Sequence, residues 1–143
     1  MQSFAADRIA YLVKQLQHQF RQATDAALRP HGLSTAQYAV LFAVSAQPGI
    51  AAAELARQSF VTRQSLQDVL GGLRRAGLVE VAQTGTGRRR DITLTDRARD
   101  LLAAADGAVR EVESRMLAGV DPADVERAVD VLRRCRDNLA TDR

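Results

Sequence analysis

Residues 51–94 contain the pattern that most restricts the fold: two helical segments separated by a tight turn, then a change to strand-like alternation. Residues 51–58 predict a short helix, and residues 59–61 predict the turn. Thr62 is a good N-cap for the next helix, in which Leu66, Val69, Leu70 and Leu73 share one face. A short helix, a turn and a capped amphipathic helix predict a helix-turn-helix.

The residues that follow predict a two-stranded hairpin. Residues 78–81 and 91–94 alternate between apolar and polar side chains, and residues 83–90 connect them. The connection contains two glycines and ends in Arg88, Arg89 and Arg90, which predicts a positively charged hairpin tip. A hairpin directly after a helix-turn-helix makes it a winged helix.

Four further helices are predicted around this pattern. They are a helix over 4–28, a helix that Ser34 caps and that stops at 47–49, a helix that Thr95 caps, and a helix that opens at Asp121-Pro122. A winged helix needs only the middle of the chain. We therefore expect one chain that is mainly α with a small β-wing, in which 33–95 bind DNA and the helices of 4–28 and 96–140 form a dimer.

The two end helices carry apolar faces that support this expectation. Six side chains make up these faces: Ile9, Leu12, Leu16, Leu132, Cys135 and Leu139. Monomeric proteins rarely leave such a face uncovered. We therefore expect these residues in a homodimer interface, with Cys135 acting as a small buried side chain.

Composition excludes several other classes of protein. One cysteine and two histidines leave no disulfide framework and no structural zinc cluster. There is no run of about 18 apolar residues for a membrane span, and charges interrupt the first thirty residues where a signal peptide would be apolar. No catalytic triad, carboxylate pair or nucleotide loop is evident. We expect no enzyme, no metal and no cofactor, and a place in the cytoplasm.

Positive charge is concentrated in one quarter of the chain. Nineteen of the 20 basic residues are arginine. Residues 57–90 hold seven arginines against Asp68 and Glu80, whereas the rest of the chain holds 13 basic and 15 acidic residues. A genome that prefers arginine to lysine explains the first observation but not the clustering. The cluster predicts a polyanionic partner, namely double-stranded DNA.

Two sets of residues are predicted to contact DNA. The first lies at the start and on the polar face of the helix after the turn: Thr62, Arg63, Gln64, Ser65 and Gln67. Arginine can pair with guanine and glutamine with adenine, while hydroxyl groups reach phosphates or bases. The second set is Arg88, Arg89 and Arg90, which suit phosphates or the minor groove. The alternatives are a solvated helix face and a charged hairpin tip that only favours solubility.

In this order and at this length, the segments resemble the MarR family of bacterial transcriptional regulators. The matching stretches are 33–41, 54–57, 73–79, the wing arginines and Leu94-Thr95. The chain departs from the family pattern in four places. The wing stretch 86–88 lacks an acidic residue, Ala98 replaces a glycine, and Asp68 stands where many members carry a basic or neutral residue. Gly71-Gly72 lie inside the helix that Thr62 caps, so we expect the second half of that helix to be less stable.

The resemblance implies a homodimeric repressor on a pseudo-palindromic operator with half-sites about 10 bp apart. It also implies that a small aromatic or lipophilic effector weakens DNA binding by changing the separation of the two winged domains. Five residues are candidates for an effector pocket: Tyr11, Gln15, His18, Tyr38 and Phe42. The first three could equally face water. Two other functions remain open, a non-specific architectural DNA-binding protein and a winged helix that binds only proteins.

Overall fold

The computed structural model describes residues 8–83 and 90–140, and it contains the helices and strands in the predicted order. The elements are α1 (Ile9–Leu28), the 3-10 turn η1 (Arg29–His31), α2 (Thr35–Ala46), α3 (Ala52–Gln58), α4 (Arg63–Arg75), β1 (Val79–Gln83), β2 (Arg90–Leu94), α5 (Asp96–Met116) and α6 (Pro122–Ala140). The chain forms two compact units, Met1–Val112 and Glu113–Arg143. All elements of the predicted winged helix lie in the first unit, which confirms a mainly helical fold with a small wing.

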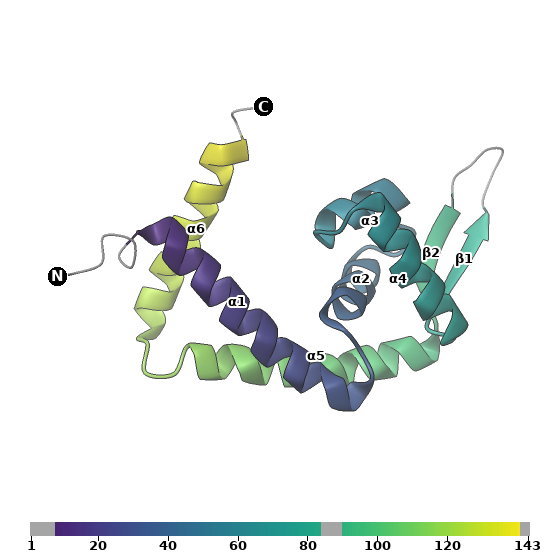
Figure 1. The fold of residues 1–143 in the computed structure, drawn as a ribbon, viewed down its shortest axis with the longest axis horizontal. Helices are drawn as coiled ribbons and strands as arrows, with labels where there is room; N and C mark the ends of the chain where they lie inside the picture. The colour runs from purple at the N-terminus through teal and green to yellow at the C-terminus, as the bar shows by residue number, and fades with distance from the viewer. Residues whose placement is uncertain (1–7, 84–89, 141–143) are drawn as a thin grey trace. The chain divides into compact units, whose positions relative to one another are not determined.

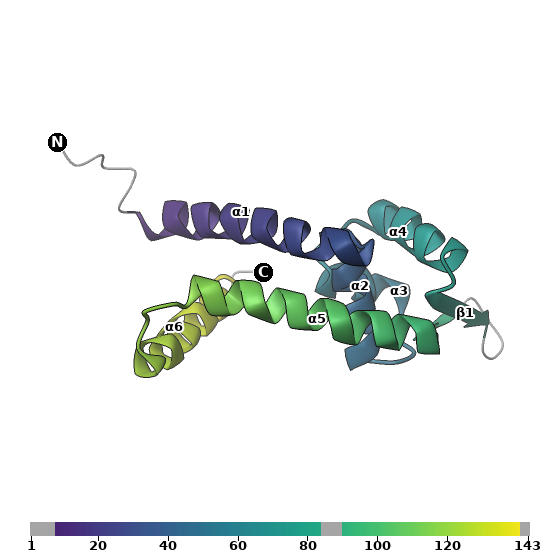
Figure 2. The ribbon, with the colours of Figure 1, turned by 90° about the horizontal axis from the view of Figure 1, so that it is seen from below.

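One apolar core holds the winged helix together. Helices α2, α3 and α4 contact one another, as the views in Figures 1 and 2 show, and β2 packs on α2. The innermost side chains come from all four elements: Leu41, Leu55, Leu66, Leu73 and Ile92 are each no more than 2% exposed. The predicted apolar face of α4 is therefore confirmed, since Leu66, Leu70 and Leu73 are buried.

Side-chain caps start the helices where the sequence predicts them. The Ser34 hydroxyl accepts a hydrogen bond from the Gln37 amide (3.1 Å), and the Gln37 side chain accepts one from the Ser34 amide (2.9 Å). Thr62 accepts from the Ser65 amide at 3.0 Å, and Thr95 accepts from the Ala98 amide at 3.2 Å. Each cap satisfies a backbone donor that the first helical turn leaves without a partner.

The turn between α3 and α4 contains a residue that is unusual for its position. Phe60 has a φ of 57°, in the left-handed region that favours glycine, and its side chain is 95% exposed. The amide of Val61 then donates to the Ala56 carbonyl at 3.1 Å, which closes the turn onto the end of α3. This short turn brings the N-terminus of α4 next to α3.

The hairpin is antiparallel, with Val79 opposite Leu94 and Val81 opposite Ile92. Val79, Ile92 and Leu94 are buried, so one face of the hairpin packs on the core. The Gly49 amide donates to the Ile92 carbonyl at 3.2 Å, which ties the loop after α2 to β2. The predicted tip residues Arg88 and Arg89 lie outside the described residues, and Arg90 begins β2.

The end helices expose the faces that the sequence predicts to be covered. On α1, Ile9 is 73% exposed and Leu12 and Leu16 are 50% exposed. On α6, no residue is buried, and Leu132 is 55% and Leu139 76% exposed. Cys135 is exposed as well, so its expected burial in a homodimer interface stays a prediction. The apolar side chains of these two faces are therefore exposed in the single chain.

Within residues 8–83 and 90–140, no helix is long and apolar enough to cross a membrane. The same residues contain no group of three or more histidine, cysteine or acidic side chains that could hold a metal ion.

Tyr38 links the winged helix to α5 through a polar network. Its hydroxyl donates to Asp106 Oδ1 at 2.8 Å, and Arg110 Nε forms an ion pair with Asp106 Oδ2 at 2.9 Å. Tyr38 and Asp106 are 68 residues apart in the chain. The pKa of Tyr38 lies far above its usual value, first because the hydroxyl is buried, and then because it donates to Asp106 and lies near the negative charge of that carboxylate. The positive charge of Arg110 lowers the pKa by a smaller amount.

This raised pKa predicts a loss of stability at alkaline pH. Above about pH 10 the unfolded tyrosine releases its proton while the folded one keeps it, so the free energy of unfolding falls as the pH rises. We expect Tyr38→Phe to cost about 1 kcal/mol at pH 8 through the lost hydrogen bond. Urea unfolding should show that the difference in the free energy of unfolding between the wild type and the variant becomes smaller at pH 11. Parallel pH curves for the two proteins would contradict this interpretation.

Candidate nucleic-acid interface

Helix α4 presents a polar face on the side opposite its buried leucines. Gln64, Gln67 and Asp68 are exposed there, and together with Arg63 they form one wall of an open groove. Ala52 and Ala53 at the start of α3 form the other wall, and the groove has a volume of about 670 Å³. Small side chains on α3 therefore leave the polar side chains of α4 accessible to a large partner.

The structure divides the five predicted α4 contacts into two groups. All five are exposed, but only Arg63, Gln64 and Gln67 line the groove. Thr62 and Ser65 form the cap instead: beyond the amide contact, the Thr62 hydroxyl donates to Ser65 Oγ at 3.0 Å. This pair holds the helix N-terminus in place, where the positive end of the helix dipole favours a phosphate.

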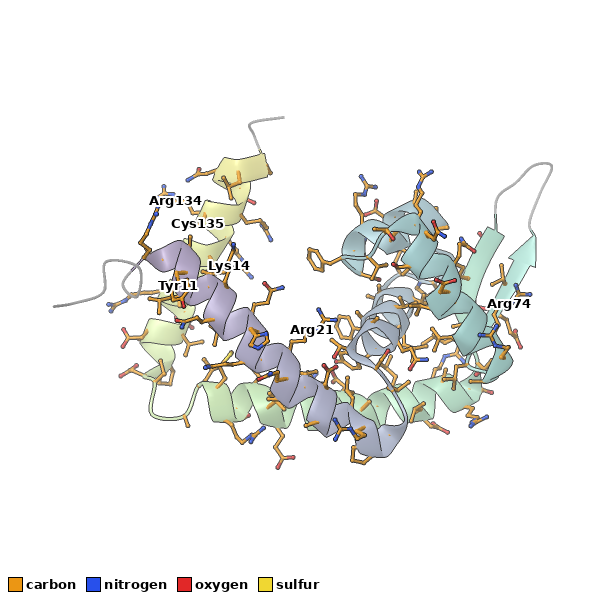
Figure 3. All side chains as sticks on the ribbon, in the orientation of Figure 1. Tyr11, Lys14, Arg21, Arg74, Arg134 and Cys135 are labelled. Atoms are coloured by element: carbon orange, nitrogen blue, oxygen red, sulfur yellow. The ribbon has the colours of Figure 1, made fainter. Side chains whose placement is uncertain are left out.

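Sequence reasoning missed part of this surface. Asp68 was noted only as a departure from a family pattern, and the two alanines of α3 were not singled out. A second, smaller recess of about 100 Å³ lies between α4 and the hairpin, with Gln67, Gly71 and Arg74 on the helix side and Val81 on the strand side. Arg74 is labelled in Figure 3, where it lies beside the hairpin. The spacing of Gln67, Gly71 and Arg74 along one helix face was the signal that could have found this recess.

The charges near the groove are mostly positive. Arg63, Arg74 and Arg75 are exposed on α4, against one acidic residue, Asp68. On α3, Arg57 forms an ion pair with Glu54, so its charge is locally balanced. The surface around α4 is therefore suited to a polyanion, and its polar wall contains the amide and guanidinium groups that read base edges.

The two glycines of α4 offer a matched test of this surface. The helix is continuous through both of them. A Cβ at Gly71 would lie 3.4 Å from Arg75 Nη1, and one at Gly72 would lie 3.8 Å from Gln37 Nε2, so flexible side chains are the only close neighbours. Gly71 follows Gln64 and Gln67 on the outer face, whereas Gly72 faces α2.

We expect Gly71→Ala and Gly72→Ala each to stabilise the protein by about 0.8–1 kcal/mol, because alanine favours the helix. Only Gly71→Ala should weaken DNA binding, since its methyl group stands where the duplex approaches the helix. Thermal unfolding and fluorescence anisotropy with labelled DNA would measure both effects. Equal DNA affinity of the two variants would place the interface elsewhere.

The predicted effector residues do not all come together in the described contacts. The rings of Tyr38 and Phe42 lie 6.1 Å apart and are tilted by 33°, but the Tyr38 hydroxyl is engaged by Asp106. Tyr11 and Lys14 line a shallow recess on α1 with Arg8 and Ala10, and both are labelled in Figure 3.

Gln15 and His18 are exposed on the same helix. The effector pocket thus stays a prediction, with only its aromatic pair seen as a contact.

Comparisons with known proteins agree with this geometry. Residues 31–90, which run from η1 to the start of β2, match the MarR family. Over 111 residues the chain is 38% identical to the HTH-type transcriptional repressor Rv2887 of Mycobacterium tuberculosis, a match that covers 77% of this chain and 80% of the repressor. Over 139 residues it is 29% identical to the transcriptional activatory protein BadR of Rhodopseudomonas palustris, with 94% and 79% covered.

Solved structures of Rv2887 have the same fold. The complex with DNA matches with a TM-score of 0.72 and 33% identity, covering 87% of this chain and 97% of that chain. The complex with salicylic acid matches with a TM-score of 0.74 and 32% identity, covering 91% and 98%. These relatives are transcription factors, which confirms the expectation of a regulator and not an enzyme. By sequence and by fold, this chain belongs to the MarR family of winged helix-turn-helix transcriptional regulators.

Proposed function

We propose that this protein represses transcription as a homodimer on a pseudo-palindromic operator, and that a small aromatic ligand weakens its binding to DNA. The observation that carries the proposal is the exposed wall of α4, where Arg63, Gln64 and Gln67 line an open groove. A major groove about 12 Å wide admits a helix that presents such a face. The protein would act at the nucleoid, in the cytoplasm of a bacterium.

The exposed apolar residues of the end helices support the homodimer. Ile9, Leu12 and Leu16 follow one another on α1 at spacings of three and four, and each is at least half exposed. Leu132 and Leu139 lie seven residues apart on α6, more than half exposed, with Cys135 between them. A single chain gains nothing from such surfaces, whereas a twofold dimer would bury them.

The proposed dimer explains the form of the operator. Two copies of α4 related by a twofold axis would enter successive major grooves on one side of the duplex, so the half-sites should lie about 10 bp apart and read as an inverted repeat. The wing arginines Arg88, Arg89 and Arg90 would add attraction to phosphates or to the minor groove.

Ligand response and repression are proposed from the relatives. Rv2887 has a structure with salicylic acid, and the aromatic pair Tyr38 and Phe42 offers ring faces to a similar ligand, together with Tyr11, Gln15 and His18 on α1. Repression is favoured over activation because the relative with the higher identity is a repressor, although the activator BadR shares the architecture.

Footprinting of the purified protein on the DNA upstream of its own gene tests the proposal. We expect a protected inverted repeat and tighter binding there than to random duplex at fixed salt. Expression of a reporter gene placed behind this repeat should fall when the protein is present. Salicylate should release the footprint in a dose-dependent way. An operator-to-random affinity ratio near one would favour an architectural DNA-binding protein. The absence of any salt-dependent binding would favour a protein-interaction module.

A further inference from the structure

Asp68 lies on the exposed face of the proposed reading helix. It follows Gln64 by one helical turn and lies on the side opposite Leu66 and Leu70, which are buried. Its side chain is exposed and lines the same groove as Arg63, Gln64 and Gln67. If α4 enters the major groove, Asp68 enters with it.

The carboxylate of Asp68 has no partner within residues 8–82 and 91–140. No hydrogen bond or ion pair to it is found there, and the positions three and four residues away are Gln64, Ser65, Gly71 and Gly72, none of which is a cation. Several acidic residues elsewhere in the protein do form ion pairs. Asp96 pairs with Arg99 at 2.7 Å and Asp106 with Arg110 at 2.9 Å, each within its own helix.

An unpaired carboxylate on a DNA-binding surface is repelled by the phosphates of any duplex. Only a favourable contact with particular bases can offset that repulsion. In the major groove the amino group of cytosine is a donor that a carboxylate can accept from, whereas guanine presents only acceptors. Adenine has an amino group too, but its neighbouring N7 acceptor repels a carboxylate. The side chain therefore favours cytosine and opposes every site that lacks it.

We propose that Asp68 is a specificity-determining residue that accepts a hydrogen bond from the amino group of a cytosine in each half-site and lowers the affinity for DNA without that base. This inference rests on the proposed function, because it requires α4 to lie in the major groove. It assigns to Asp68 two effects of opposite sign, a gain on the operator and a penalty on all other DNA.

The test measures the affinities of the wild type, Asp68→Ala and Asp68→Asn at fixed salt for three kinds of duplex. These are the footprinted operator, a random duplex, and operators in which each C·G pair of the half-site is changed in turn to A·T. Asp100→Ala is the matched control, since it removes an exposed carboxylate from α5, outside the groove. Thermal unfolding of each variant shows that its fold is intact.

We expect Asp68→Ala to bind the random duplex more tightly than the wild type and to lose about 5- to 150-fold in operator preference. One C·G change should weaken the wild type but leave Asp68→Ala nearly unaffected, and Asp68→Asn should gain affinity for adenine at that position. Asp100→Ala should change neither ratio.

Two results would overturn the inference, and they are distinguishable. If the wild type prefers its operator but Asp68→Ala changes the affinity for all duplexes by the same factor, Asp68 acts only as a general negative charge and the proposed function stands. If the wild type shows no operator preference at all, the proposed function fails and this inference fails with it.

Discussion

Leu132→Asp is expected to convert the dimer into monomers and to abolish tight operator binding. Leu132 is 55% exposed in the single chain, on a face of α6 that continues to Leu139. In the proposed interface the new carboxylate would be buried without a partner, at a cost of several kcal/mol. Sedimentation velocity would report the change in mass, and anisotropy with operator DNA the loss of affinity, although no residue of α4 has changed.

Arg134→Asp provides the control for this variant. Arg134, labelled in Figure 3, is exposed and lies two residues further along α6, on the opposite side of the helix from Leu132. The Arg134→Asp variant also introduces an aspartate, but outside the apolar face, so the protein should remain dimeric. A folded Leu132→Asp protein that sediments as a dimer and binds its operator normally would refute the assignment of α6 to the interface.

Gln64→Ala and Arg63→Ala are expected to reduce binding to the operator far more than binding to random DNA. Both side chains line the groove at the first turn of α4, where a reading helix meets base edges. A lost bidentate contact is worth about 1–3 kcal/mol, or roughly 5- to 150-fold in affinity. Competition between operator and random duplex at fixed salt measures this selectivity directly.

Matched variants separate base reading from general effects. Arg57→Ala removes the same charge as Arg63→Ala but from α3, where Arg57 pairs with Glu54. Gln22→Ala removes an exposed glutamine from α1. Neither should change the operator preference. Should Gln64→Ala and Arg63→Ala instead lose both kinds of binding equally, these side chains position the helix and do not read bases.

The order of elements followed from local signals. Ser34, Thr62 and Thr95 each accept the backbone hydrogen bond that their position predicts, because a cap acts on an amide only three residues away. Gly77 has a φ of 73° after α4, as its position at the helix end requires. Such interactions depend on neighbours in the chain, so the helix starts, the hairpin and the apolar face of α4 could be read from the sequence.

The positions of the contact residues within the candidate site were partly predictable. Arg63, Gln64 and Gln67 follow from the helical period once the leucine face is known. Their opposing wall does not, because the approach of Ala52 and Ala53 to α4 depends on how α3 packs against α4 through the turn at Phe60. The position of Asp68 in the same groove likewise depends on this packing of α3 against α4.

The sequence by itself determined the order of the helices and strands, which side of α4 is apolar, and where positive charge gathers. The tertiary structure alone decided which surfaces meet: Tyr38 and Asp106 are 68 residues apart yet 2.8 Å from each other, and the apolar side chains on α1 and α6 that the sequence places in an interface stay exposed in one chain. The physical reason is the separation along the chain of the residues that interact. Caps and periodicity act over three or four residues, whereas grooves, buried networks and uncovered faces arise only when distant segments compete for the same core.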